Sequence, residues 1–237
     1  MSATFKHFPV VDLFAGPGGL GEGFATLKNE HGNKAFKSVV SIERDDFAHQ
    51  TLHLRHFLRE FPEGKFPSEY YSYLEGKISK LSLYEKFPLQ KNHADQSALK
   101  ISLGDEDPVL VNKIISDRLA GEKLWALVGG PPCQAYSLVG RSRMKNTPGF
   151  SDDIRHFLYK EYLSIIAEHQ PPIFVMENVK GLLSSKVGNK FAIDMILEDL
   201  KNPRLALERN TPSIKYKLYG LGGSGFPGII QDPREFI

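Results

Sequence analysis

The sequence predicts an α/β fold in which a mostly parallel sheet carries helices on both faces. Short apolar and β-branched runs alternate with amphipathic helical patterns, which is typical of βαβ units. A glycine-rich turn joins the first of these runs to the first helical pattern. The composition is that of an ordinary globular protein, with 41% hydrophobic and 24% charged residues, and it excludes a disordered chain.

The first half of the chain predicts two strands and two helices. Residues 8–14 (FPVVDLF) and 36–42 (FKSVVSI) are the strand candidates, and residues 46–57 predict the second helix. After the first strand, the glycine-rich turn at residues 16–19 leads into the first helix. Its apolar face is expected at positions i, i+4 and i+7, which are Leu20, Phe24 and Leu27.

The second half predicts three more strands and two more helices. Residues 124–128 (LWALV), 173–176 (IFVM) and 216–221 are the strand candidates. One helix has its apolar stripe at Ile154, Phe157, Leu158, Tyr162, Ile165 and Ile166. The other, at residues 191–200, is expected to place four apolar residues on one side: Ala192, Met195, Ile196 and Leu200.

Residues 55–100 are too long for an ordinary connection in an α/β fold, and this segment is rich in aromatic residues, lysine and proline. We expect a peripheral insertion with short helices of its own, within one domain spanning residues 1–237. Residues 220–228 (GLGGSGFPG) are expected to form a loop.

Charge and cysteine content exclude several classes of protein. A single cysteine rules out an internal disulfide framework, and no apolar run approaches the roughly 18 residues that a membrane span needs. We therefore expect a cytoplasmic protein without a membrane anchor. The net charge of +2 is too small to indicate a nucleic-acid partner by itself.

Four features follow predicted strands, and ligands of open α/β sheets bind beyond the carboxyl ends of the strands. The first is the turn after residues 8–14, in which Gly16, Gly18 and Gly21 have the spacing G-x-G-x-x-G. Such a turn brings backbone amides close to a ligand, although a tight strand-to-helix turn also uses glycine for purely structural reasons. The second is Glu43, which can accept ribose hydroxyls or can be an ordinary solvated acid.

The third feature is the only cysteine, Cys133, which follows Pro131 and Pro132. A lone cysteine is more often an inert buried residue, but two prolines indicate a rigid loop at the ligand edge, where the reactive thiolate is favoured. The fourth is Glu177, followed by Asn178. A carboxyl group that emerges from a hydrophobic strand is expected to be partly desolvated and suited to proton donation; the alternative is an ordinary salt bridge.

The segments DLFAGPGG, GPPCQAYS and MENVKGLL, in this order, resemble the signature motifs of the DNA (cytosine-5) methyltransferase family. The resemblance runs from Val10 to about Ser184 and implies a Rossmann-like fold that binds S-adenosylmethionine, without a metal. It implies a set of cofactor-binding residues: Phe14, Ala15, Gly16, Gly18, Gly19, Glu43, Arg44, Asp105, Pro131 and Leu158. Of these, Glu43 would bind the ribose, Arg44 would pass near the adenine and Asp105 would read the adenine amino group.

The resemblance also implies the chemistry. Cys133 would add to C6 of cytosine, and Glu177 would protonate or hydrogen-bond N3 while C5 accepts the methyl group. Three residues would support the cysteine loop: Pro132, Gln134 and Asn178. The partner would be double-stranded DNA with a flipped base, and its phosphates would be contacted by the loop that carries Ser137, Arg141 and Arg143. The alternative for this loop is an ordinary solvated segment.

Complete members of the family continue into a Gln-x-Arg-x-Arg-like element and a target-recognition region. Residues 231–237 match that element poorly. We therefore expect the amino-terminal catalytic portion of an enzyme, incomplete at the C-terminus, with a second subunit or a missing C-terminal part carrying target recognition. We expect this chain alone not to methylate DNA. The resemblance further implies a nucleoid-associated protein of a restriction-modification system.

Three alternatives stay open at this point. An RNA cytosine methyltransferase of the same fold would share the motifs. A nicotinamide-dependent oxidoreductase could use Gly16, Gly18 and Gly21, but it leaves the residues around Cys133 and Glu177 without a role. A non-catalytic DNA-binding fragment could retain the motifs without activity.

Overall fold

The structure of the chain is a computed structural model that describes residues 7–132, 154–177, 186–187, 190–209, 214–221 and 229–230. The chain divides into two compact units. The first comprises Met1–Gly130 and Pro171–Met176, and the second comprises Pro131–Gln170 and Glu177–Ile237.

The first unit is built on a five-stranded parallel sheet in the order β3-β2-β1-β4-β5. The strands are β1 (Phe8–Leu13), β2 (Phe36–Glu43), β3 (Ala98–Lys100), β4 (Ala126–Gly129) and β5 (Ile173–Met176). Strand β1 is central and covered on both faces, so that Val10, Val11 and Leu13 are fully buried. The predicted α/β class with a parallel sheet is confirmed.

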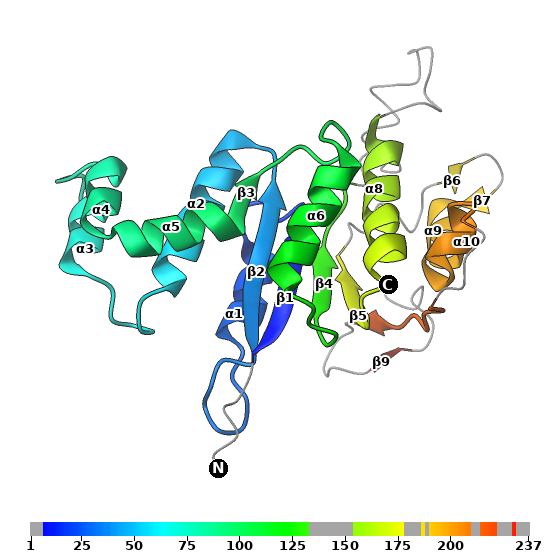
Figure 1. Ribbon diagram of the computed structural model, residues 1–237, viewed down its shortest axis with the longest axis horizontal. Helices are drawn as coiled ribbons and strands as arrows, with labels where there is room; N and C mark the ends of the chain where they lie inside the picture. The colour runs from blue at the N-terminus through cyan, green and yellow to red at the C-terminus, as the bar shows by residue number, and fades with distance from the viewer. Residues whose placement is uncertain are drawn as a thin grey trace. The chain divides into compact units, whose positions relative to one another are not determined.

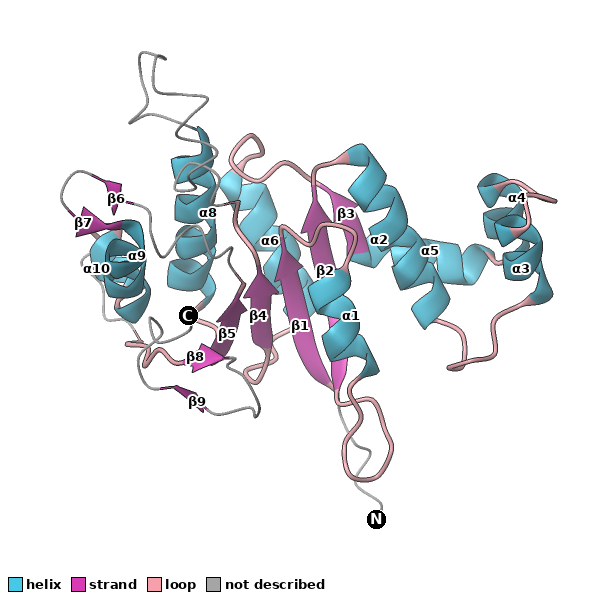
Figure 2. Ribbon diagram, turned by 180° about the vertical axis from the view of Figure 1, so that it is seen from behind, coloured by secondary structure: helices cyan, strands magenta, loops and turns pink. Residues whose placement is uncertain are grey.

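Helices cover both faces of this sheet (Figures 1 and 2). Helix α1 (Gly19–Thr26) lies on one face, where Leu20 and Phe24 pack against Val10 and Val128, and α6 (Pro108–Leu119) lies on the other. Helix α2 (Asp46–Arg59) begins after Asp45, whose side chain accepts hydrogen bonds from two amides of the first turn.

Three short helices separate α2 from β3, and Figure 1 shows that α3 and α4 lie away from the sheet. They are α3 (Ser68–Leu74), α4 (Lys80–Lys86) and α5 (Pro88–Ser97). A small core holds them to α2, because Phe57 of α2 packs with Leu83, Tyr84 and Ala94. The segment expected as an insertion thus contains three helices, whereas its first residues complete α2 and its last three form β3.

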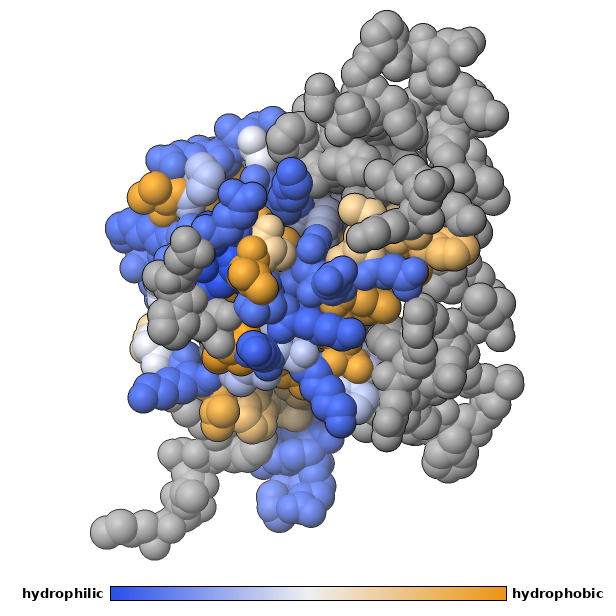
Figure 3. Space-filling view, turned by 90° about the vertical axis from the view of Figure 1, so that its right-hand side faces the viewer, coloured by the Kyte–Doolittle hydropathy of each residue, from blue (hydrophilic) through white to orange (hydrophobic). Residues whose placement is uncertain are grey.

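The second unit contains helices and short hairpins in its described residues. The elements are α8 (Ile154–His169), β6 (Lys186–Val187), β7 (Lys190–Phe191), α9 (Ala192–Lys201), α10 (Pro203–Ala206), β8 (Gly220–Leu221) and β9 (Ile229–Ile230). The Nε–H group of Arg204 donates to the carbonyl of Ala167 over 2.8 Å and so links α10 to α8. Leu205 and Ile214 are exposed, and Figure 3 shows hydrophobic patches interrupted by hydrophilic side chains.

Three details of the sequence prediction are wrong, and two elements were missed. Leu27 is the C-cap of α1 rather than part of its apolar face, and Met195 is 39% exposed beside the buried Ile196. The strand expected at residues 216–221 is limited to Gly220–Leu221. Strand β3 and helix α6 were not predicted at all.

Candidate active site

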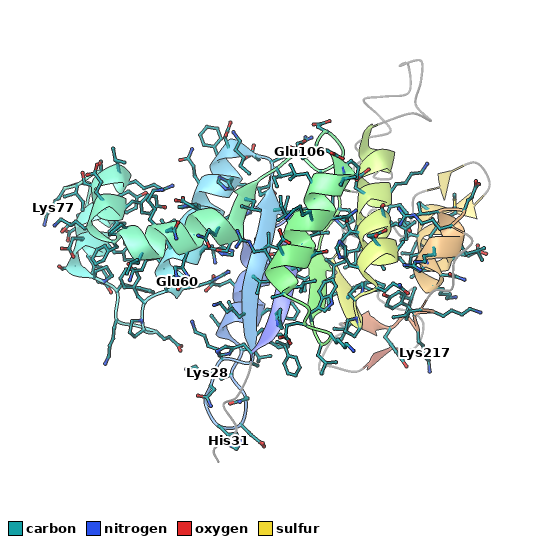
Figure 4. The ribbon with its side chains drawn as sticks, in the orientation of Figure 1. Lys28, His31, Glu60, Lys77, Glu106 and Lys217 are labelled. Carbon is teal, nitrogen blue, oxygen red and sulfur yellow. The ribbon has the colours of Figure 1, made fainter. Side chains whose placement is uncertain are left out.

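The parallel register brings four strand ends to one edge of the sheet. Leu13 pairs with Ile42 of β2 and with Gly129 of β4, and Gly129 pairs in turn with Met176 of β5. Figure 4 shows Glu106, just before α6, at this edge, whereas Lys28 and His31 lie at the opposite end of the sheet. The segments expected to carry chemistry therefore leave the strands side by side, as their positions in the sequence predict.

The turn after β1 has an unusual backbone. Phe14 has φ +55°, in the left-handed region that non-glycine residues rarely adopt, and Gly16 has φ +56°. A left-handed residue other than glycine costs about 1–3 kcal/mol and persists only when its surroundings hold it. The turn is held by backbone bonds, in which Ala15 N–H donates to the Ile42 carbonyl over 3.0 Å and Gly18 N–H to the Ala15 carbonyl over 2.9 Å.

The three glycines at G-x-G-x-x-G spacing have different structural roles. A Cβ atom added to Gly21 would lie 2.5 Å from Oδ2 of the buried Asp12, and one on Gly18 would lie 2.9 Å from Cδ1 of Leu52. A side chain at Gly21 would therefore displace Asp12, and one at Gly18 would displace Leu52 and would be strained by a φ of +88°. A Cβ atom on Gly16 would meet nothing within 4 Å, and the same is true of Gly19. The open backbone surface of the turn is therefore at Gly16 and Gly19, where a ligand can approach closely.

Glu43 lies at the end of β2 and binds this turn through its carboxylate. Its Oε2 accepts a hydrogen bond from the Gly16 amide over 2.8 Å, and its Oε1 accepts from the amides of Arg44 (2.8 Å) and Asp45 (2.7 Å). Arg44 is exposed. The structure thus joins Glu43 to the glycine turn by a direct hydrogen bond, whereas the sequence predicted only that both would bind the same cofactor.

The remaining predicted residues are distributed over both units. Asp105 is exposed, follows β3 in the chain and accepts a hydrogen bond from the Ser102 hydroxyl over 2.6 Å. In the second unit Pro131 is buried, Pro132 is half-buried and Leu158 of α8 is buried. The residues of the cysteine loop and Asn178 lie outside the described residues; these are Cys133, Gln134, Ser137, Arg141, Arg143 and Asn178.

The expectation that Glu177 is partly desolvated is wrong in this structure, because Glu177 is exposed. It follows Met176 directly, so its place after the last strand of the sheet agrees with the prediction. The residue that follows a buried strand is exposed to solvent unless another segment or a ligand covers it. The sequence of β5 alone does not show whether any segment or ligand covers Glu177.

A polar network on α2 was missed by the sequence reasoning. The hydroxyl of Tyr84 donates to Nδ1 of His53 over 2.9 Å, and Nε2–H of His53 donates to Asp95 over 2.8 Å. His49 Nε2–H donates to the carbonyl of Ala98 in β3 over 3.0 Å. Burial lowers the pKa of His53 although Asp95 opposes this effect. One pattern in the sequence could have indicated this network, namely three histidines at helical spacing: His49, His53 and His56.

Within the described part of the chain, no group of three or more histidine, cysteine, aspartate or glutamate side chains is arranged to hold a metal ion. None of the helices described there combines the length and the apolar character that crossing a bilayer requires.

Comparison with known proteins assigns the family. Residues 87–202 match the family described as C-5 cytosine-specific DNA methylase. A type II methyltransferase of Bacillus paralicheniformis is 33% identical over 199 residues, which cover 77% of this chain and 43% of the relative. The chain belongs to the C-5 cytosine-specific DNA methylase family.

Two other type II methyltransferases match more of the chain at lower identity. A type II methyltransferase of Desulfomicrobium norvegicum is 28% identical over 81% of this chain and 33% of its own length. One from Picosynechococcus is 25% identical over 96% of this chain and 70% of its own length. This methylase chain therefore spans less than half of the length of the first two relatives.

Proposed function

We propose that this chain carries the catalytic residues for transfer of a methyl group from S-adenosylmethionine to C5 of cytosine in DNA, within a restriction-modification system. The observation that carries the proposal is the register of the sheet, in which Leu13, Gly129 and Met176 are paired neighbours. The family's cofactor, cysteine and glutamate motifs directly follow these three residues in the chain. Membership of the C-5 cytosine-specific DNA methylase family supports the same chemistry.

The turn after β1 fits such a cofactor. Its backbone is open at Gly16 and Gly19, and Glu43 stands beside it with a carboxylate that can accept a ribose hydroxyl. By family resemblance the cofactor would be held by Phe14, Ala15, Gly16, Gly18, Gly19, Glu43, Arg44, Asp105, Pro131 and Leu158. When bound, it supplies an electrophilic sulfonium methyl group.

Cys133 and Glu177 make the cytosine reactive. C5 of cytosine is a poor nucleophile, so the Cys133 thiolate adds to C6 and the electron pair of the C5–C6 double bond becomes available at C5. Glu177 donates a proton or a hydrogen bond to N3 and stabilises the adduct as its charge develops. A base whose N3 edge meets the exposed Glu177 would exclude water from its carboxyl group. Loss of the C5 proton after methylation lets the double bond re-form and Cys133 depart.

The target cytosine has to leave the duplex to reach Cys133. Arg141, Arg143 and Ser137 are proposed to contact the DNA backbone beside the flipped nucleotide, while Pro132, Gln134 and Asn178 support the cysteine loop. The relatives are named type II methyltransferases, and this supports duplex DNA over RNA as the substrate class.

The proposal is tested by incubating the purified chain with methyl-labelled S-adenosylmethionine and either unmethylated duplex DNA or transfer RNA. A parallel sample adds any polypeptide that is encoded directly downstream. Labelled 5-methylcytosine in DNA, absent with Cys133→Ser, supports the proposal. Label confined to transfer RNA identifies an RNA enzyme. Label in neither nucleic acid, in the sample that also contains the downstream polypeptide, contradicts cytosine methylation.

A further inference from the structure

The end of β2 holds the turn that follows β1 by two adjacent hydrogen bonds. The Ala15 amide donates to the backbone carbonyl of Ile42 over 3.0 Å, as a continuation of the parallel ladder. The next amide, that of Gly16, donates to Oε2 of Glu43 over 2.8 Å. At Glu43 the side-chain carboxylate, rather than a backbone carbonyl, is therefore the acceptor of the hydrogen bond. The position of Gly16 depends on this carboxylate.

The carboxylate of Glu43 is itself fixed by its surroundings. Oε1 accepts two further hydrogen bonds, from the amides of Arg44 and Asp45, at the start of α2. A carboxylate offers about four lone-pair directions, so three of them are already used by backbone amides. The direction that remains is on Oε2, beside the Gly16 amide.

The turn needs such an anchor because its conformation is unfavourable. Phe14 is left-handed with φ +55°, and non-glycine residues stay in that region only where neighbouring structure holds them. Gly16 has open space on its Cβ side, where an added Cβ atom would meet nothing within 4 Å, and its amide donates to Glu43. Glu43 therefore restrains the part of the turn that is open to a ligand.

We propose that Glu43 is a positioning residue for the turn at residues 14–19 as well as a ribose ligand. It sets the turn in its open shape before the cofactor binds. It keeps the bond to Gly16 while Oε2 accepts one ribose hydroxyl with its remaining lone pair. This inference rests on the proposed function, because it takes S-adenosylmethionine as the ligand of the turn.

Binding of a ligand without ribose hydroxyls separates the two roles of Glu43. The probes are S-adenosylhomocysteine and its 2′,3′-dideoxy analogue, titrated calorimetrically into the wild-type chain, Glu43→Gln and the control Glu75→Gln at the end of α3. A glutamine side chain cannot accept all three amide hydrogen bonds. We expect Glu43→Gln to weaken binding of the dideoxy analogue by about tenfold or more, since hydrogen bonds to charged groups contribute that much. Equal affinities of Glu43→Gln and wild type for this analogue would overturn the inference.

Amide exchange measured by NMR tests the same inference without any ligand. In the wild-type chain the Gly16 amide should be protected, and in Glu43→Gln it should exchange about tenfold faster while Glu75→Gln matches the wild type. An unprotected Gly16 amide in the wild type contradicts the inference even if Glu43→Gln fails to fold. A wild type that binds neither probe contradicts the proposed cofactor, whereas the exchange result still decides the role of Glu43.

Discussion

The guanidinium of Arg59 donates a hydrogen bond to Nε2 of His56 over 3.3 Å, on the buried side of α2. The hydroxyl of Ser97 donates to the His93 carbonyl, so it accepts from Nδ1–H of His56 over 2.8 Å. The proton of His56 is therefore on Nδ1, and Nε2 is an acceptor that also faces the Ser41 hydroxyl at 3.0 Å. A second proton on Nε2 would point at a cation.

This arrangement predicts that the fold loses stability in mild acid. Burial, followed by the charge of Arg59, lowers the pKa of His56 to about 3 from its ordinary value of 6.5. The unfolded chain therefore binds a proton at this position below pH 6.5, while the folded chain does not. The free energy of unfolding should fall by about 2 kcal/mol between pH 7 and pH 5 on account of His56. Urea unfolding at both pH values measures this loss.

Variants at two histidines isolate this effect. His56→Gln should be less stable at pH 7 but should depend less on pH, whereas the exposed His31→Gln should keep the wild-type dependence. His53 contributes in the same direction, because burial lowers its pKa as well. An unchanged pH dependence in His56→Gln would show that His56 is not the titrating group.

Two glycines of α1 provide a matched pair for the packing of this helix on β1. Gly21→Ala places a Cβ atom 2.5 Å from Oδ2 of Asp12 and should cost about 1–3 kcal/mol of stability. Gly23→Ala meets nothing within 4 Å and should be neutral or stabilising by up to about 1 kcal/mol, because alanine favours helix. Urea midpoints compare the two variants directly, and equal midpoints would exclude close packing at Gly21.

Cys133 is expected to form a covalent bond with its target base. In the full-length enzyme, DNA that contains 5-fluorocytosine should be trapped in the presence of S-adenosylmethionine, because fluorine at C5 prevents the elimination that releases the cysteine. Cys133→Ala should abolish the trapped complex on denaturing gels, and Cys133→Ser should do the same. A complex that survives in Cys133→Ala would refute the proposed nucleophile.

Glu177 is expected to act on the base rather than on the cofactor. In the full-length enzyme, Glu177→Gln should slow methyl transfer by about 10²–10⁴-fold, the range of a positioned general acid. Binding of S-adenosylhomocysteine, measured by calorimetry, should stay within about threefold of the wild type, since such a neutral substitution removes no cofactor contact. A comparably large loss of cofactor affinity would instead place Glu177 in the cofactor site.

The strands of the sheet were the most predictable part of the fold. The bounds of β5 were predicted without error, because Ile173–Met176 is a continuous apolar run bounded by Pro172 and Glu177. Strand β3 was missed because it has only three residues, Ala98–Lys100, at the edge of the sheet. Helix α6 could have been predicted, since Asp107 caps it and Pro108 begins it ahead of a regular apolar stripe.

The candidate site was predictable in its location but not in its contacts. Parallel strands end at one edge, so Glu43 and the glycine turn could be expected to lie near each other. The bond from Gly16 to Glu43 depends on a left-handed Phe14, and no local sequence pattern predicts φ +55° at a phenylalanine. The network of His53 likewise joins Tyr84 and Asp95, which meet this helix only in the tertiary structure.

The strand order also determines how this sheet can assemble. Strands β1, β2 and β3 are neighbours in both sequence and space, so residues 8–100 can pair before β4 exists as a structure. β4 and β5 then join the opposite side of β1, each against a strand that is already in place. During synthesis the sheet would grow outward from its first strand, and the longest segment between consecutive strands of the sheet is residues 44–97, between β2 and β3. The pairing of β3 with β2 is therefore expected to limit the folding rate.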